Sequence, residues 1–96
     1  MAILGDTKMR TKGELKYFLL NRLGLRERTA NVLTRYAEEW IELPCSIEEA
    51  ITALGRTEDG KPIIRNIHNM GVNSTKEAVR KAYGYMAEIC SGRTKR

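Results

Sequence analysis

The sequence holds few of the side chains that metal sites and enzyme active sites use most often. It contains one histidine, His68, and two cysteines, Cys45 and Cys90, which lie far apart and form no CxxC pair. Zinc sites draw on closely spaced Cys and His ligands, so the sequence predicts no metal ion. A nucleophile and base pair would need His68 beside one of the cysteines, and a partly exposed helical position explains His68 more simply. We therefore expect no enzyme, no catalytic residue and no cofactor.

Long hydrophobic runs are also missing. No apolar stretch approaches the roughly 20 residues of a membrane-spanning helix, so we expect no membrane partner. Residues 1–10 lack the apolar centre and the small-residue cleavage site of a secretory signal. These absences predict a cytoplasmic protein whose cysteines are buried thiols, because disulfide frameworks belong mainly to small exported chains. The 42% of hydrophobic residues still suffices for one core, and 96 residues predict one domain.

Charge, by contrast, is abundant and unevenly distributed. The chain carries a net charge of +5, which arises from +3 in residues 1–24, −4 in 25–60 and +6 in 61–96. The basic ends favour a polyanionic partner, because neutralising phosphates releases counterions. The acidic middle is typical of a solvated face, and it also leaves open a contact with another protein.

The pattern of helix signals predicts an all-α fold. Capping boxes, in which Ser or Thr precedes Glu by three positions, begin at Thr11, Ser46 and Ser74. Glycines predict helix ends at Gly24, Gly55, Gly71 and Gly92. Apolar residues at helical intervals then predict helices over 11–23, about 26–40, 46–54, 62–70 and 74–91, with a turn at 57–60. We expect a compact orthogonal bundle of four to five short helices.

The last predicted helix carries two ambiguous features. Gly84 lies in its interior, where it is expected either to allow close packing or to be a tolerated imperfection. Tyr83 and Met86 are expected to face the core, although together with Tyr85 they also fit a dimer face. The sequence leaves both questions open.

A tight turn between the last two predicted helices is a candidate anion site. The fourth helix stops at Gly71 and Ser74 caps the next one, so unpaired backbone N–H groups point outward at the turn. Lys76, together with Lys61 or Arg65, adds positive charge nearby. The alternative is an ordinary helical hairpin with a good cap.

The start of the second predicted helix is a further candidate. Arg28 and Asn31 are three residues apart, so both project from one side of the helix while Ala30 and Leu33 face inward. An arginine beside an asparagine can contact the phosphates and the minor-groove acceptors of DNA. The alternative is a solvated helix edge, where both residue types are common.

Taken together, these stretches resemble the C-terminal domain of the bacterial RNA polymerase alpha subunit. The resemblance runs from about Leu23 to Ile89 and includes the short helix that starts at Ser46. Its most specific parts are the pattern Arg-x-Ala-Asn-x-Leu from Arg28 and the pattern Asn-x-Gly-x-x-Ser-x-x-Glu from Asn69. The resemblance implies a helix-hairpin-helix element that binds A·T-rich DNA across the minor groove, and it makes transcription proteins further candidate partners.

The resemblance also implies roles for individual residues. The family's groove-entering arginine falls on Arg28, and its asparagine falls on Asn31. Its hairpin glycine, serine and glutamate fall on Gly71, Ser74 and Glu77, and Glu77 is expected to complete the cap of Ser74 rather than to contact DNA. This chain has Asn73 where the family commonly has a basic residue, which predicts one phosphate contact fewer. With Lys76 added, the predicted DNA-binding residues are Arg28, Asn31, Gly71, Asn73, Ser74 and Lys76.

The helix pattern and the resemblance together predict the organisation of the chain. A single helical domain spans 1–96, with a flexible segment at 1–10, an additional N-terminal helix at 11–23, a core resembling the polymerase domain at 25–90 and a basic tail at 93–96. We expect a free-standing relative of that domain. The alternative function is a helical protein-interaction module that keeps the fold without binding DNA, and the acidic middle segment motivates it.

Overall fold

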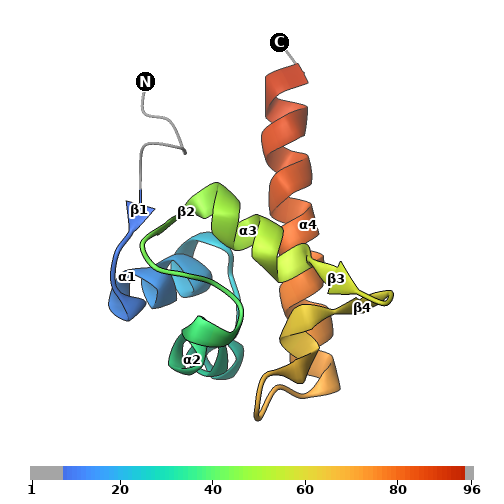
Figure 1. The fold of residues 1–96 in the computed structure, drawn as a ribbon. Helices are drawn as coiled ribbons and strands as arrows, with labels where there is room; N and C mark the ends of the chain where they lie inside the picture. Colours follow the sequence, from blue (N-terminus) through green and yellow to red (C-terminus); the bar gives the residue numbers. More distant parts are fainter. Residues whose placement is uncertain (1–7, 95–96) are drawn as a thin grey trace.

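The computed structural model describes residues 8–94, with side chains up to Glu88. Within this range the chain is an all-α domain, as predicted, with four α-helices and two very small sheets (Figure 1). The α-helices are α1 (Lys12–Tyr17), α2 (Glu27–Arg35), α3 (Ile47–Gly55) and α4 (Val72–Thr94). A π-helical turn, Phe18–Arg22, continues α1, and 3-10 helices lie at Ala37–Glu39 and at Ile63–Asn66, the second of which we call η4.

Two of the three predicted capping boxes are confirmed. At the start of α1 the Thr11 hydroxyl accepts from the Glu14 backbone N–H at 3.1 Å, and the Glu14 carboxylate accepts from the Thr11 N–H at 3.3 Å. At the start of α3 the Ser46 hydroxyl and the Glu49 carboxylate make the same exchange at 3.0 and 2.9 Å. Local side chains therefore satisfy donors that a bare helix start leaves unpaired.

The third predicted cap, at Ser74, is wrong. Helix α4 begins earlier, at Val72, and its first backbone bond runs from the Thr75 N–H to the Gly71 carbonyl oxygen at 2.9 Å. Ser74 therefore lies inside the first turn, and the carboxylate of Glu77 is bound elsewhere. The predicted end at Gly92 is also wrong, because α4 continues to Thr94; an interior glycine costs only about 1 kcal/mol and need not stop a helix.

The second predicted helix is shorter than expected. Helix α2 ends at Arg35, and Tyr36 leaves the helical conformation with φ −109° and ψ 37°. The change of direction brings the Trp40 side chain back over α2, where its Nε1 donates to the Leu33 carbonyl oxygen at 2.9 Å. A buried indole thus finds the partner that burial requires.

Two short antiparallel sheets are formed by the segments outside the helices. Strand β1 (Lys8–Met9) pairs antiparallel with β2 (Cys45–Ser46), and Met9 is buried. Of the segment 1–10 that was expected to be flexible, residues 1–7 lie outside the described part of the chain. Strands β3 (Thr57–Glu58) and β4 (Lys61–Pro62) form a hairpin at the predicted turn. Its central residues Asp59 and Gly60 have φ of 56° and 78°, as a tight hairpin turn requires.

The core is made by apolar faces of all four α-helices and of η4. Its largest fully buried apolar side chains are Leu15, Leu19, Leu33, Ile51, Leu54 and Ile64. Cys45 is a buried free thiol whose pKa is raised by burial and by the nearby Glu49 carboxylate. Cys90 has its side chain outside the described part.

Helix α3 crosses α4 closely at Gly55 rather than at Gly84. A Cβ atom at Gly55 would lie 3.0 Å from the Tyr83 ring, and the Tyr83 hydroxyl donates to the Gly55 carbonyl oxygen at 3.2 Å. No described atom lies within 4 Å of a Cβ at Gly84, so of the two alternatives for this glycine the one of close packing is wrong. Tyr83 was expected in the core but is exposed, whereas Tyr85 packs edge-on against Phe18 with ring centroids 5.8 Å apart.

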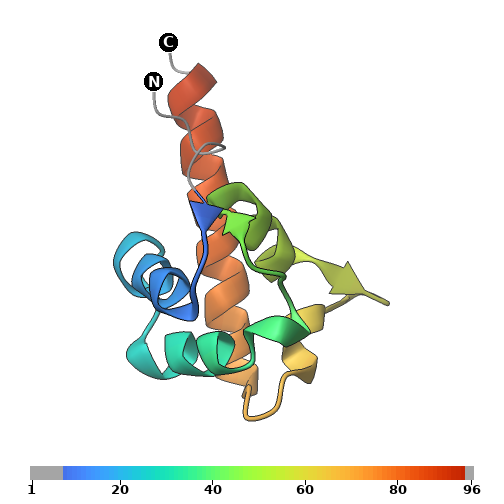
Figure 2. The same ribbon diagram turned by 60° about the vertical axis from the view of Figure 1, so that its left-hand side comes forward.

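The long helix α4 determines the shape of the molecule. Its C-terminal half projects beyond the body, on the side where β1 and β2 lie, and its N-terminal turn lies at the opposite end beside α2 (Figures 1 and 2). Within residues 8–94, none of the helices combines the length and the apolar character needed to span a lipid bilayer.

Candidate nucleic-acid interface

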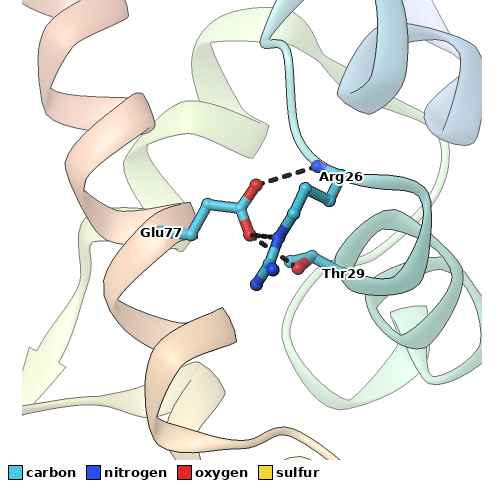
Figure 3. A network of polar contacts seen from close by, with 3 residues as sticks. All are labelled: Arg26, Thr29 and Glu77. Atoms are coloured by element: carbon cyan, nitrogen blue, oxygen red, sulfur yellow. Dashed lines mark hydrogen bonds and ion pairs between the residues drawn. The ribbon is translucent and has the colours of Figure 1, made fainter.

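Glu77 ties the start of α2 to α4. One carboxylate oxygen accepts from the Arg26 backbone N–H at 2.8 Å, and the other accepts from Arg26 Nε at 3.0 Å and from the Thr29 hydroxyl at 2.8 Å (Figure 3). These bonds join residues 48 and 51 positions apart in the sequence. The expectation that Glu77 completes the cap of Ser74 is therefore wrong, since both of its oxygens face α2.

The Glu77 carboxylate is a buried charge, and both of its oxygens accept hydrogen bonds. The Glu77 side chain is 10% exposed, while the Arg26 side chain is 63% exposed. Burial by itself raises the pKa of Glu77, but the hydrogen bonds from the Arg26 backbone, the Thr29 hydroxyl and the Arg26 guanidinium outweigh it and leave that pKa below its ordinary value. Glu77 is therefore ionised near neutral pH and holds α2 through its acceptors.

A second contact holds the other end of α2. Tyr36, which follows the last residue of α2, packs edge-on against His68 with ring centroids 5.9 Å apart. His68 lies in the turn between η4 and α4. Because Thr29 contacts Glu77 and Tyr36 contacts His68, α2 runs alongside the segment from the turn to the second turn of α4.

The two predicted groups of residues thus lie on neighbouring elements. Arg28 and Asn31 are exposed, while Ala30 and Leu33 of the same helix are fully buried. Arg28 directly precedes Thr29, whose hydroxyl is bonded to Glu77. Arg35 is exposed as well and follows Asn31 by one helical turn, so it extends this polar edge of α2.

The predicted hairpin residues are accessible at the start of α4. Gly71, Asn73 and Lys76 are exposed and Ser74 is half-buried. No described atom comes within 4 Å of a Cβ at Gly71, which leaves room for another molecule to approach the backbone. The first backbone N–H groups of α4 have no partner within the helix, and no acidic residue lies in the first turn.

Beside this turn lies a basic groove that the sequence analysis missed. It has a volume of about 630 Å³ and is lined by Gly24, Arg26, Asn73, Lys76, Glu77, Arg80 and Lys81. The single carboxylate among these residues is the one already bound to Arg26, so the groove offers positive charge to a ligand. A signal for Arg80 was present, since it follows Lys76 by four residues on the same helix face.

Acidic residues gather in a different part of the molecule. Glu42, Glu48 and Glu49 line a groove around Trp40 that shares no residue with the basic groove. Across the described residues, no three side chains of His, Cys, Asp or Glu are grouped as metal ligands would be. The surface beside α2 and the start of α4 is therefore the candidate site, and its chemistry favours an anion.

Comparisons with protein-family models, with curated protein sequences and with solved structures found no match for this chain.

Proposed function

We propose that the protein binds double-stranded DNA with the start of α2, the turn at 67–71 and the first turns of α4. The observation that supports it best is the pair of contacts, Glu77 to α2 and Tyr36 to His68, that hold α2 against the turn. These contacts hold α2, which carries the exposed Arg28 and Asn31, beside the segment that carries the exposed Gly71 and Lys76. The resemblance to the polymerase alpha C-terminal domain points to the same residues.

Each group has a separate task on a duplex. Arg28 enters the minor groove, where narrow A·T-rich tracts carry the most negative potential. Asn31 and the exposed backbone at Gly71 fix the position of the protein on sugar and phosphate. Lys76 contributes charge to the phosphates, as does Arg80 along the basic groove.

The proposed setting is the cytoplasm, in transcriptional regulation. A protein with this task must share a compartment with accessible DNA, and the net charge of +5 favours association with a polyanion. Transcription proteins are proposed as further partners on the strength of the resemblance alone.

Fluorescence anisotropy with A·T-rich and G·C-rich duplexes at low salt tests the proposal. Arg28→Ala should weaken binding to the A·T-rich duplex by about 1 to 3 kcal/mol and reduce the preference for it. Lys76→Ala should weaken binding to both duplexes equally and reduce the salt slope by about one. Arg56→Ala is the matched control, because Arg56 is exposed but lines only the grooves around Trp40. Absence of binding to either duplex, or equal effects of the Arg28 and Arg56 variants, would refute the proposal.

A further inference from the structure

A second groove, with different chemistry, runs along a neighbouring face of α4. It has a volume of about 710 Å³, and its apolar lining consists of Pro62, Met70, Val72, Val79 and Tyr83, which we call the apolar groove. Val72 is 70% exposed and Tyr83 is 57% exposed, and both are among the large hydrophobic residues that the described surface leaves open. Neither the core nor the proposed DNA contacts account for this exposure.

The apolar residues of α4 in this groove follow a helical stripe. Val72, Val79 and Tyr83 are spaced at i, i+7 and i+11, so they align on one side of α4. The stripe is about 17 Å long at 1.5 Å per residue. Ala78 and Ala82, which are fully buried, belong to the face that packs on the body. Val72 and Tyr83 are the exposed ends of the second stripe, and Val79 between them is half-buried and also packs against the core. The stripe has the spacing that a helical partner matches.

The charged side chains that line the apolar groove are all basic. Arg65, Lys76 and Arg80 line it, and no Asp or Glu is among the described residues that do so. The acidic hairpin residues Glu58 and Asp59 line a separate hollow that shares only Pro62 and Arg65 with the groove. An occupant must therefore bury apolar side chains in the centre and carry negative charge at its edges.

We propose that the apolar groove is a docking site for an amphipathic helical segment of another protein, with apolar residues at helical spacing and Asp or Glu beside them. A helix laid along α4 would place its apolar face on Val72 and Val79 and its carboxylates on Lys76 and Arg80. Nucleic acid fits poorly, because Val72, Val79 and Met70 offer no partner to phosphate.

The docking site is argued separately from DNA binding, because none of its apolar side chains is given a task on the duplex, although Met70 and Val72 lie in the segments proposed to contact DNA. The two grooves nevertheless share Lys76 and Arg80. The docking experiment is therefore run without DNA, and failure of one proposal does not imply failure of the other.

The test uses a fluorescein-labelled synthetic peptide of about fifteen residues, with Leu at helical spacing flanked by Glu, and a second peptide in which every Glu is Lys. The Glu peptide should bind, and the Lys peptide should bind at least about tenfold more weakly, a difference of about 1.4 kcal/mol. Val72→Asp should lower the affinity for the Glu peptide at least about tenfold. This substitution is compatible with folding, because Val72 is exposed at the start of a helix, where Asp is favourable.

Charge reversal supplies a positive readout. The double variant Arg65→Glu with Arg80→Glu should no longer bind the Glu peptide and should bind the Lys peptide instead. The control Arg56→Glu, outside the groove, should change the binding of neither peptide. Equal binding of the two peptides, or Glu-peptide binding that survives Val72→Asp, overturns the proposal. A dimer seen by light scattering and abolished by Val72→Asp also overturns it, because a second copy would then occupy the groove.

Discussion

Replacing Glu77 with alanine should lower the free energy of unfolding by about 2 to 5 kcal/mol, a large share of the roughly 5 to 15 kcal/mol that stabilises a domain. The substitution removes the acceptors of three hydrogen bonds between α2 and α4. Thr29 is fully buried, so its hydroxyl loses its partner where water does not replace it. We expect the α2 start to detach from α4.

The magnitude follows from the separate bonds. A buried hydroxyl without a partner costs about 1 to 3 kcal/mol, and the partly buried Arg26 backbone N–H adds about 1 kcal/mol. The ion pair with the exposed Arg26 guanidinium adds only about 0 to 1 kcal/mol, because solvent screens it. Arg26→Ala, which keeps the backbone bond, should therefore cost far less than Glu77→Ala.

Urea denaturation followed by circular dichroism measures both variants. For a domain of this size the Glu77→Ala loss corresponds to a fall in Tm of at least about 8 °C. Thr29→Val, which keeps the shape of the side chain, should give an intermediate loss. If Arg26→Ala destabilised the protein as much as Glu77→Ala, the exposed ion pair would carry the contact, and the reasoning from buried acceptors would be refuted.

The variant Glu77→Gln distinguishes two ways in which Glu77 would influence the proposed DNA binding. If Glu77 acted only through its charge, Glu77→Gln would strengthen binding by removing a negative charge from the basic groove. Because the carboxylate positions α2, we expect weaker binding to the A·T-rich duplex, measured under conditions where the variant is folded. Tighter binding by the folded variant would contradict the positioning role.

The remaining predictions concern acid stability and the helix caps. The lowered pKa of Glu77 means that its contribution is complete above the ordinary glutamate pKa and is lost as pH falls through the lowered value. The unfolding free energy of the native protein should therefore fall more steeply in acid than that of Glu77→Gln, as urea titrations at a series of pH values would show. Ser46→Ala should cost about 1 kcal/mol by removing a cap, whereas Ser74→Ala inside α4 should change stability by less than about 0.5 kcal/mol. Equal losses in the two serine variants would contradict the observed start of α4.

The sequence predicted those features that depend on neighbours in the chain. The caps at Thr11 and Ser46 and the turn at 57–60 each involve residues within three or four positions, and the structure confirms them. The cap at Ser74 had the same local pattern, but the carboxylate of Glu77 binds α2 instead. A partner about fifty residues away leaves no mark on local spacing, so this competition was invisible.

In the candidate site, too, local spacing predicts some features, while others depend on how the helices pack. Exposure of Arg28 and Asn31 follows from the helical face opposite Leu33, which the spacing predicts. The contribution of Arg26 and Lys81 to one groove depends on how α2 crosses α4, and no single helix pattern contains that information. For Tyr83 the helical spacing allowed both a core position and a dimer face, and the structure places it where α3 meets α4 at Gly55, where it stays exposed.

The projection of α4 beyond the body bears on how copies of this domain can be combined. The segment β1 and the C-terminal part of α4 emerge at one end of the molecule, whereas the turn at 67–71 lies at the other (Figures 1 and 2). A linker attached at the C-terminal end of α4 would leave from the side remote from the proposed DNA contacts, carried on about 17 Å of helix beyond Tyr83. Two domains tethered in this way would keep both hairpin turns free, and their avidity for a duplex with two sites would be set by the reach of the linker.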